Sequence, residues 1–427
     1  MKRVKMKHWV FVGVAVVVLT GLMLSATCVN AQEKATLKYT FWSGNEKEAN
    51  ELAARYEEDN PNINIMWEMY PYEEYWKKIP ILLAAGTPPE VYDVCALYFH
   101  DLASRGQILD TTDLVERDLN MDNYFESVLF GYDWPPGSKN YSALGFSWTI
   151  TVLYYNKSMF DARGVNYPND SWSWQDLREA AIKLTADTDG DGEIDQWGYQ
   201  STRMRTNLDT TFYSNGGRML NTLRNECVLD QYPQNIETAQ FFVDMIYEDK
   251  ISPPPPLGKG DMVNARFKTG KVGMITTLLH LIGDFREIKD FEWDIAMVPK
   301  GTVTRMSYGG ADPTGISPFT KYKEEAWEFL QFLLSERRGM LLMTGRVPVN
   351  RKVATSEAYL QADLLPENMQ VIFDSEQYMR DADFSLKWSE WHTAMQQELD
   401  LAFMQDISVE EALQRATKAV NRVIQAD

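Results

Sequence analysis

Five acidic residues at every second position could bind a metal ion. The segment DTDGDGEID, residues 187–195, would direct four carboxylates and one main-chain carbonyl oxygen toward a common centre. Oxygen ligands of this kind are those that calcium prefers. A calcium loop counted from the first aspartate needs a bidentate glutamate at its twelfth position, where this chain has Gly198, so a tight Asp/Gly turn is the alternative. The predicted ligands are Asp187, Asp189, Asp191, Glu193 through its carbonyl oxygen, and Asp195.

Tryptophan supplies a second kind of chemistry. The chain holds 13 tryptophans, and indole rings stack well on the apolar C–H faces of pyranose rings. Sugar hydroxyls need donors and acceptors, which carboxylates, amides and main-chain groups provide in a partly dry site. The composition therefore suits carbohydrate binding.

The sequence lacks the common hydrolase motifs. It contains neither a G-x-S-x-G nucleophile elbow nor an H-E-x-x-H zinc helix. Beyond residue 31 the histidines are His100, His280 and His392, which are too far apart for metal-ligand spacing. A glycosidase needs only two carboxylates, and the chain holds 61 acidic residues. We therefore expect a binding protein that needs no cofactor, with a secreted carbohydrate-active enzyme as the alternative.

The N-terminus has the features of a secretory signal peptide. Four basic residues precede an uncharged apolar run over residues 9–23, and Val29 and Ala31 occupy the positions that a signal peptidase reads. The apolar run is short for a membrane-spanning helix. We expect cleavage after Ala31 and export to the periplasm or to the outer side of the cytoplasmic membrane. A lipid anchor at Cys28 is the alternative.

Removal of the signal makes the chain more acidic. The first 31 residues hold four Lys or Arg and no Asp or Glu, so the remainder has 38 basic and 61 acidic residues, a net charge of −23. Such a surface repels nucleic acid and anionic lipid and suits a neutral or cationic ligand. A chain of this length is too long for one compact core, so two lobes are expected.

Alternating strands and helices predict an α/β fold with parallel sheets. Residues 37–41 and 63–69 alternate as strands around a helix over 49–56. A helix near 75–85 precedes the apolar segment VYDVCAL, residues 91–97, which is predicted to be a strand buried on both faces. The pattern recurs later in the chain. Strands are expected at 151–156, 271–276 and 293–298, and helices from Ser173, at 236–248, at 324–334 and from Ser408.

The order of several motifs resembles the bacterial extracellular solute-binding proteins that feed sugar ABC importers, the group of maltose- and oligosaccharide-binding proteins. These motifs are TFWSGNEKEANELAARYEEDNPNINI, LYYNKSMFDARGV, SWSWQDLREAAIKLT, NARFKTGKVGM, WDIAMVPKG, YGGADPTGIS and EEAWEFLQFLLS. The resemblance covers nearly the whole mature chain. It implies a two-lobe, type II periplasmic-binding-protein fold in which hinge motion closes the lobes over a ligand.

The resemblance also implies lobe boundaries. The N-terminal lobe would comprise 32–147 and about 310–348, and the C-terminal lobe about 151–308 and 352–427. The crossing segments would lie near 145–151, at Gly309 and Gly310, and near 347–352. Cys95 and Cys227 would then lie in different lobes as free, buried thiols.

Ligand contacts are expected where relatives place them, beyond the carboxyl ends of the strands and on the crossings. Trp148, on the first crossing, is expected to be buried only when something fills the cleft. Gly145 stands where relatives usually have a proline on that crossing. The segment TTLLHLIGDF lacks the aromatic residue that many relatives have after the GKVGM strand, which predicts a different ligand. The expected ligand-binding residues are Trp42, Asn45, Glu46, Tyr75, Tyr98, Trp148, Asn207, Asp209, Gly309, Gly310, Asp312 and Trp388. Trp67, Trp76 and Trp327 fall on core faces of strands or helices, so they are expected to pack inside the protein.

Several alternatives stay open at this point. Tyr75 could equally be a core residue on a helix face, and one of Trp388 and Trp391 could be core while the other faces the cleft. Arg203 and Arg205 could pair with acidic sugars or be solvated. The implied partners are a carbohydrate and a membrane permease, and a monomer is expected. A non-sugar or acidic-sugar ligand is the remaining alternative within this family.

Overall fold

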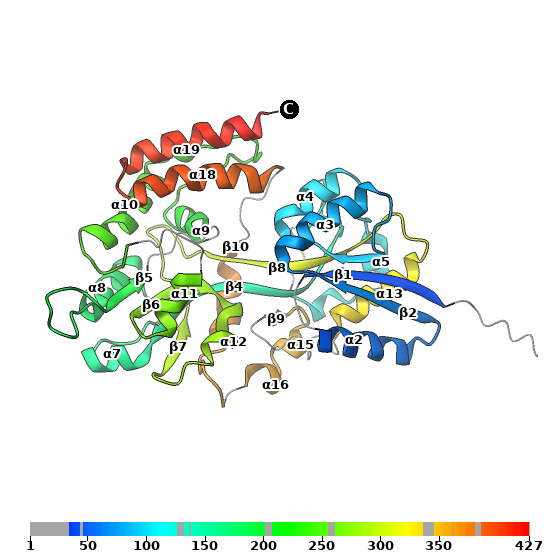
Figure 1. Cartoon of the computed structure of the whole chain (residues 1–427), viewed down its shortest axis with the longest axis horizontal. Helices are drawn as coiled ribbons and strands as arrows, with labels where there is room; N and C mark the ends of the chain where they lie inside the picture. Colours follow the sequence, from blue (N-terminus) through cyan, green and yellow to red (C-terminus); the bar gives the residue numbers. More distant parts are fainter. Residues whose placement is uncertain are drawn as a thin grey trace, which may run out of the picture.

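The computed structural model describes residues 34–42, 46–125, 132–135, 138–200, 207–254, 261–335, 346–361, 363–380 and 386–426. Two α/β lobes lie side by side, and two long strands run from one to the other (Figure 1). The expected signal peptide lies outside the described residues. None of the described helices combines the length and apolar composition of a membrane-spanning segment.

The first lobe is built on a parallel sheet. Strand β1 pairs in parallel with β2 and β3, and β3 pairs with the antiparallel strand β8. Helices cover both faces of this sheet (Figure 1). The strands are β1 Ala35–Phe41, β2 Ile63–Met69 and β3 Val91–Asp93, and the helices are α2 Glu46–Asp59, α3 Tyr72–Ala84, α4 Ala96–Ser104, α5 Thr112–Asp118, the 3-10 turn η1 Met121–Asn123, and α13 Lys323–Leu334.

The third strand is shorter than predicted. Only Val91–Asp93 pairs as a strand, and α4 begins at Ala96 after Cys95, which is its N-cap. The sequence prediction over 91–97 was therefore wrong at its C-terminal end. A short apolar run looks alike in a buried strand and in a buried helix turn, and here the run crosses from one into the other.

The second lobe combines a mixed sheet with most of the remaining helices. Its strands are β5 Trp197–Gln200, β6 Val272–Leu278 and β7 Trp293–Ala296; its helices are α7 Lys157–Arg163, α8 Trp174–Leu184, α9 Asn207–Ser214, η2 Leu229–Gln231, α10 Pro233–Tyr247, α11 Asp261–Lys268, η3 Leu279–Leu281, α12 Ile282–Phe285, α18 Trp388–Phe403 and α19 Val409–Ile424. Two predicted helix starts are confirmed: Ser173 forms a capping box with Asp176, and the Ser408 hydroxyl accepts a hydrogen bond from the Glu411 amide.

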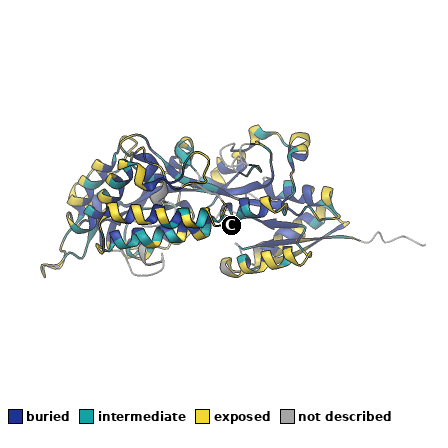
Figure 2. Cartoon of the chain, turned by 90° about the horizontal axis from the view of Figure 1, so that it is seen from above, coloured by how far each residue is buried: buried dark blue, intermediate teal, exposed yellow. Residues whose placement is uncertain are grey.

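Two antiparallel strands connect the lobes. β4 (Leu144–Asn156) pairs with β8 (Ser307–Ile316) in its first half and with β6 and β7 in its second half. Short elements complete this central region: β9 Val347–Pro348, α15 Arg351–Ala354, α16 Glu357–Leu360, α17 Val371–Ser375, η5 Glu376–Tyr378 and β10 Met379–Arg380. The α/β fold with two lobes is as predicted, and Figure 2 shows buried residues along the strands and exposed residues on the outer faces of the helices.

Cys95 and Cys227, the cysteines of the described residues, form no disulfide. Cys227 is buried, as expected, and burial raises the pKa of its thiol to about 11. Cys95 is only half-buried, so the expectation of a buried thiol was wrong for this residue. The reason is its position at the carboxyl end of β3, where the chain leaves the sheet to start α4.

Candidate functional site

Aromatic rings gather at the carboxyl end of the first-lobe sheet. The Trp42 ring, directly after β1, lies 6.0 Å from the ring of Tyr72, 5.1 Å from that of Tyr75 and 5.6 Å from that of Trp76. The ring of Tyr98, on α4, stacks on that of Trp76 at 4.1 Å and 22°. These five residues form the first-lobe aromatic cluster. Ligands of open α/β sheets bind at this edge.

The members of the cluster differ in exposure. Trp42, Trp76 and Tyr98 are half-buried, and Tyr72 is 37% exposed, so their rings reach solvent. Tyr75 is completely buried, and its hydroxyl donates to the main-chain oxygens of Asp93, at 2.5 Å, and of Thr40, at 3.3 Å. Tyr75 therefore packs beneath Trp42 as a core residue, which was the alternative to its expected ligand role.

Sequence reasoning missed two members of this cluster. Trp76 was assigned to packing, although it is half-buried and stacked on Tyr98. Tyr72 was not singled out, although its hydroxyl lies 3.6 Å from the Cys95 sulfur. The spacing of Tyr72 and Trp76, four residues apart at the start of α3, puts both on one helix face and was the available signal.

Trp148 lies on the first crossing but is enclosed by protein. Its indole is fully buried, 5.3 Å from the ring of Phe125, and its main chain pairs with Val347 of β9. The expectation that this ring is buried only when the cleft is filled was wrong, because β9 and the segment around Phe125 already cover it. Its indole nitrogen has no hydrogen-bond partner among the described residues.

The second crossing runs through Gly309 and Gly310, which pair with Ile150 and Thr149 of β4. A Cβ on Gly309 would come within 2.4 Å of the Met379 side chain. Close approach of β10, rather than a ligand, thus accounts for glycine at position 309. Asp312 pairs with Ser147 through its main chain, and its side chain lies outside what the structure describes.

The tryptophans of the KWSEW segment are both buried. Trp388 and Trp391 are 1% and 0% exposed, and the Trp388 ring stacks on His392 at 4.6 Å. Thus neither ring of this pair faces solvent, contrary to the expectation that one would face the cleft. Two contacts explain this: α18 packs along α19, and it also contacts α4 of the other lobe.

The contact between α4 and α18 joins the two lobes. Lys387 is the N-cap of α18 and has no side-chain cap of its own, but its backbone N–H donates to the carboxylate of Asp101 on α4. Burial raises the pKa of Asp101, and this hydrogen bond opposes the rise. A carboxylate at a helix N-terminus is electrostatically favourable, so the first lobe caps a helix of the second.

The remaining residues that were expected to contact the ligand lie next to, or within, segments that the structure does not describe. Glu46 is the exposed first residue of α2. Asn207 and Asp209 belong to α9, with side chains outside the described set, and Asn45, Arg203 and Arg205 lie wholly outside it.

A charged group that the sequence did not reveal lies between the lobes. Arg346, directly before β9, is half-buried, and desolvation lowers its pKa while Asp93 and Cys95 of the first lobe raise it. The charge of Arg346 also reaches His280, at the end of β6 in the second lobe. The third crossing was predicted to start one residue later, at Val347, which is why Arg346 was overlooked.

His280 is exposed to solvent. Nevertheless burial among surrounding protein atoms, together with Arg346, lowers its pKa to about 4. Its imidazole is therefore neutral at physiological pH.

Two further hollows lie elsewhere in the molecule. A cavity of about 40 Å³ inside the second lobe, between α8, α9 and β6, has room only for water. A recess of about 360 Å³ in the first lobe lies at the amino end of β3, beside Lys38 and Glu90, away from the aromatic cluster.

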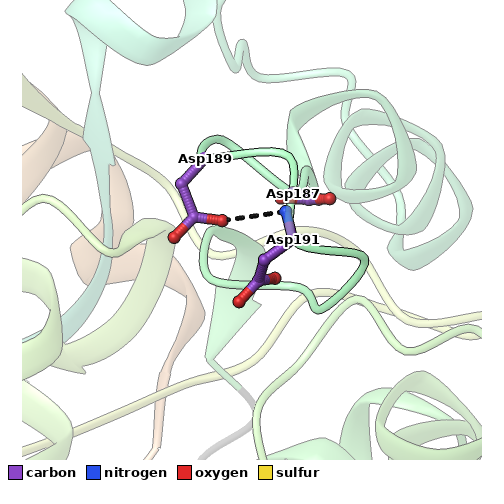
Figure 3. A group of neighbouring side chains, drawn as sticks. All are labelled: Asp187, Asp189 and Asp191. Atoms are coloured by element: carbon purple, nitrogen blue, oxygen red, sulfur yellow. Dashed lines mark hydrogen bonds between the residues drawn. The ribbon is translucent and has the colours of Figure 1, made fainter.

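The acidic loop lies on the second lobe between α8 and β5. Carboxylate oxygens of Asp187, Asp189 and Asp191 lie within 4.8 Å of one another (Figure 3). The Asp187 carboxylate accepts hydrogen bonds from the Gly190 and Gly192 amides at 2.7 and 2.8 Å, which lower its pKa. The structure thus brings together three of the expected calcium ligands in a turn that its own hydrogen bonds also stabilise.

The two remaining predicted calcium ligands, Asp195 and Glu193, do not belong to this group of three carboxylates. Asp195 accepts hydrogen bonds from the amide and hydroxyl of Thr188, at 2.8 and 2.5 Å, and closes the base of the loop. The Glu193 amide donates to Asp191.

Comparison with known proteins gives the same two-lobe architecture. The chain superimposes on an ABC substrate-binding protein of Listeria monocytogenes in complex with cycloalternan, with a TM-score of 0.80, 23% identity, and coverage of 92% of this chain and 100% of that one. It also superimposes on the maltose/maltodextrin-binding domain MalE of Bdellovibrio bacteriovorus bound to maltotriose, with a TM-score of 0.72, 18% identity, and coverage of 92% and 100%.

Two relatives found by sequence similarity are also binding proteins. A binding protein of Brucella abortus (strain 2308) is 27% identical over 74% of this chain and 75% of its own length. The sn-glycerol-3-phosphate-binding periplasmic protein UgpB of Pectobacterium atrosepticum is 24% identical over 73% and 74%. The family described as bacterial extracellular solute-binding protein matches residues 43–339. The chain therefore belongs to this family, and it is a solute-binding protein rather than an enzyme.

Proposed function

We propose that this protein is the exported substrate-binding component of an ABC importer, and that it captures a carbohydrate and delivers it to a membrane permease. The observation that carries the sugar assignment is the first-lobe aromatic cluster, because three half-buried rings and the exposed ring of Tyr72 meet at the edge where the fold binds ligands. Structural neighbours bound to cycloalternan and maltotriose support the same class.

Capture requires that closing the lobes encloses the solute. The continuous strands β4 and β8 provide the connection between the lobes, and α4 and α18 provide a contact that only approached lobes can make. The permease then distinguishes closed from open protein. The expected N-terminal signal peptide supports export, and the proposed working form is a monomer.

The acidic loop is a separate, structural part of the proposal. We propose that Asp187, Asp189 and Asp191 bind calcium weakly at the concentrations found outside cells. The loop precedes β5, which leads directly toward α9. Calcium would therefore stabilise the second lobe without touching the solute.

Titration with a sugar panel tests the transport assignment. The purified mature protein is titrated calorimetrically with glucose, galactose, maltose, maltotriose, mannotriose, glucuronate and galacturonate, and each mixture is melted in parallel. At least one sugar should give saturable heat, and at a hundredfold excess over Kd it should raise the free energy of unfolding by about 2.7 kcal/mol. Chromatography should recover that sugar uncut. Absence of heat and of any melting shift across the panel would remove the sugar assignment.

A further inference from the structure

The recess at the amino end of β3 lies at the opposite end of the first-lobe sheet from the aromatic cluster, which gathers beyond the carboxyl end of the parallel strand β1. Its volume of about 360 Å³ is in the range of pockets that hold small molecules. Its walls are the loop between α3 and β3, the loop between β8 and α13, and Lys38 of β1. All three segments belong to the first lobe, so the recess does not depend on closure of the lobes.

Hydrogen bonds join the walls of this recess. The pairing of β1 with β3 starts at Tyr39 and Val91, and one residue earlier the Lys38 N–H donates to the Glu90 carboxylate at 2.8 Å. The Glu90 carbonyl oxygen accepts a hydrogen bond from the Ser317 N–H at 2.9 Å. Glu90 therefore connects β1 to both loops, and its carboxylate already has a structural role.

The charged side chains of the lining are two lysines and one glutamate. Lys38 and Lys321 are exposed, whereas Glu90 is half-buried and accepts the Lys38 N–H. The recess is therefore locally cationic, although the mature chain carries a net charge of −23. Exposed charges are screened beyond about 8 Å at physiological ionic strength, so the two ammonium groups, rather than the distant acidic surface, dominate the potential inside the recess.

Two aromatic rings accompany these lysines. Phe319 is 65% exposed, and its N–H donates to the Ser317 hydroxyl at 3.2 Å, which fixes the turn that carries the ring. Tyr322 is half-buried against the core, and its N–H donates to the Thr320 hydroxyl at 3.1 Å. An exposed apolar ring beside hydroxyls and ammonium groups can stack on the C–H face of a pyranose while the polar groups bind its substituents.

We infer that this recess is a second carbohydrate site, which takes an acidic sugar residue: the pyranose ring stacks on Phe319, and Lys38 and Lys321 bind its carboxylate or phosphate group. An inorganic anion would leave the ring unused, and a neutral sugar would leave the two charges unused. The site goes beyond the proposed function, because it lies away from the aromatic cluster and stays formed in open protein. Free acidic sugars and the acidic residues of polysaccharides both have this chemistry.

Calorimetry and hydrogen exchange on the full mature chain test the site. Glucuronate and glucose 6-phosphate are compared with glucose, galacturonate is compared with galactose, and polygalacturonate represents a polymeric source. At least one acidic ligand should bind roughly fivefold or more tightly than its neutral partner and should slow amide exchange in residues 85–90 and 317–322. Protection by a free acidic sugar identifies the free sugar as a ligand, whereas protection by polygalacturonate alone identifies a polysaccharide.

Variants of the lining give the expected magnitudes. Lys38→Gln combined with Lys321→Gln should lose roughly 5- to 30-fold in affinity for the acidic ligand. Phe319→Ala should lose roughly 2- to 10-fold. All three side chains are exposed, and the Lys38 main chain keeps its bond to Glu90, so these variants should fold normally. Lys47→Gln, on α2 of the same lobe, removes a lysine that is 84% exposed and is the matched control with unchanged affinity.

Trp42→Ala separates this site from the aromatic cluster. It should leave the protection of the two loops unchanged, whether or not the proposed function is correct. Acidic-sugar binding that is lost in Trp42→Ala and survives the double lysine variant belongs to the cluster, so it overturns the second site and supports the proposed function. Absence of loop protection with every acidic ligand, or equal protection by the neutral partners, also overturns the second site. Loop protection without any binding at the cluster supports the second site and removes the proposed function.

Discussion

In the first lobe the rings of Trp42 and Tyr98 end at the carboxyl edge of the sheet and stay half-buried, whereas in the second lobe the rings of Trp388 and Trp391 are covered by protein. Both pairs belong to segments that sequence comparison would assign to the ligand side. The first-lobe rings pack against one another and leave faces open. The second-lobe rings are covered by helix packing and by contact of α18 with α4.

Ligands of open α/β sheets bind beyond the carboxyl ends of the strands. This rule selects the end of the sheet where a ligand can bind, but it does not select the side chains that are accessible there. Whether a given ring is available there depends on which neighbouring elements cover it. The two lobes therefore differ in burial: rings stay half-buried at the first-lobe edge, whereas the second-lobe tryptophans are covered.

The largest expected effect is on stability, at the covered tryptophans. Replacing Trp391 by alanine removes a fully buried indole and should lower the free energy of unfolding by about 3–5 kcal/mol. Denaturant titration measures this loss. Sugar affinity at a temperature where the variant is folded should change little. A large loss of affinity in a fully folded variant would mean that the second-lobe tryptophans act on the ligand after all.

The open ring of Trp42 should behave in the opposite way. Trp42→Ala removes a half-buried stacking face, so sugar affinity should fall roughly 10- to 100-fold with only a small decrease in melting temperature. Calorimetry with the sugar identified in the panel gives the affinity, and a thermal melt of the same sample is the control. An unchanged Kd would place the sugar elsewhere.

The contact between the lobes should have a smaller, kinetic effect. Asp101→Ala removes the acceptor for the Lys387 amide, so closed protein should lose about 1 kcal/mol and the solute should dissociate roughly fivefold faster. Stopped-flow displacement measures that rate. Glu116→Ala, which removes an exposed carboxylate from α5 of the same lobe, is the matched control. Equal dissociation rates in both variants would show that the contact does not affect closure.

The smallest expected effect is that of calcium. Chelation should lower the melting temperature by a few degrees at most, because the loop lacks a bidentate glutamate and its own hydrogen bonds stabilise the turn. Sugar affinity should be unchanged. Replacing Asp189 and Asp191 by asparagine should abolish the response to chelator. A melt that is insensitive to both treatments would identify the loop as a plain turn.

Much of the fold could be predicted from local sequence patterns. Alternating apolar residues predicted β1 and β2, and serine followed three residues later by an acidic residue predicted the starts of α8 and α19. These signals survive because each depends on residues close in sequence. The segment 91–97 failed because a short apolar run fits two kinds of buried structure.

The candidate site was predicted less completely. Trp42 and Tyr98 were found because they follow strands or lie near strand ends. Trp76 was assigned to the core, since helical spacing says which residues share a face but not whether a neighbour covers that face. Arg346 was missed because a lone arginine in an irregular segment carries no local pattern.

The sequence by itself determined the class of the protein: the order of its motifs, the alternation of strands and helices, and the acidic loop followed from residues near one another. Only the tertiary structure decided which side chains can meet a solute. Tyr75 and Trp148 became core residues, and the charge of Arg346 came to act on His280. Burial and electrostatic coupling depend on elements far apart in the chain, and no local pattern encodes which of them pack together.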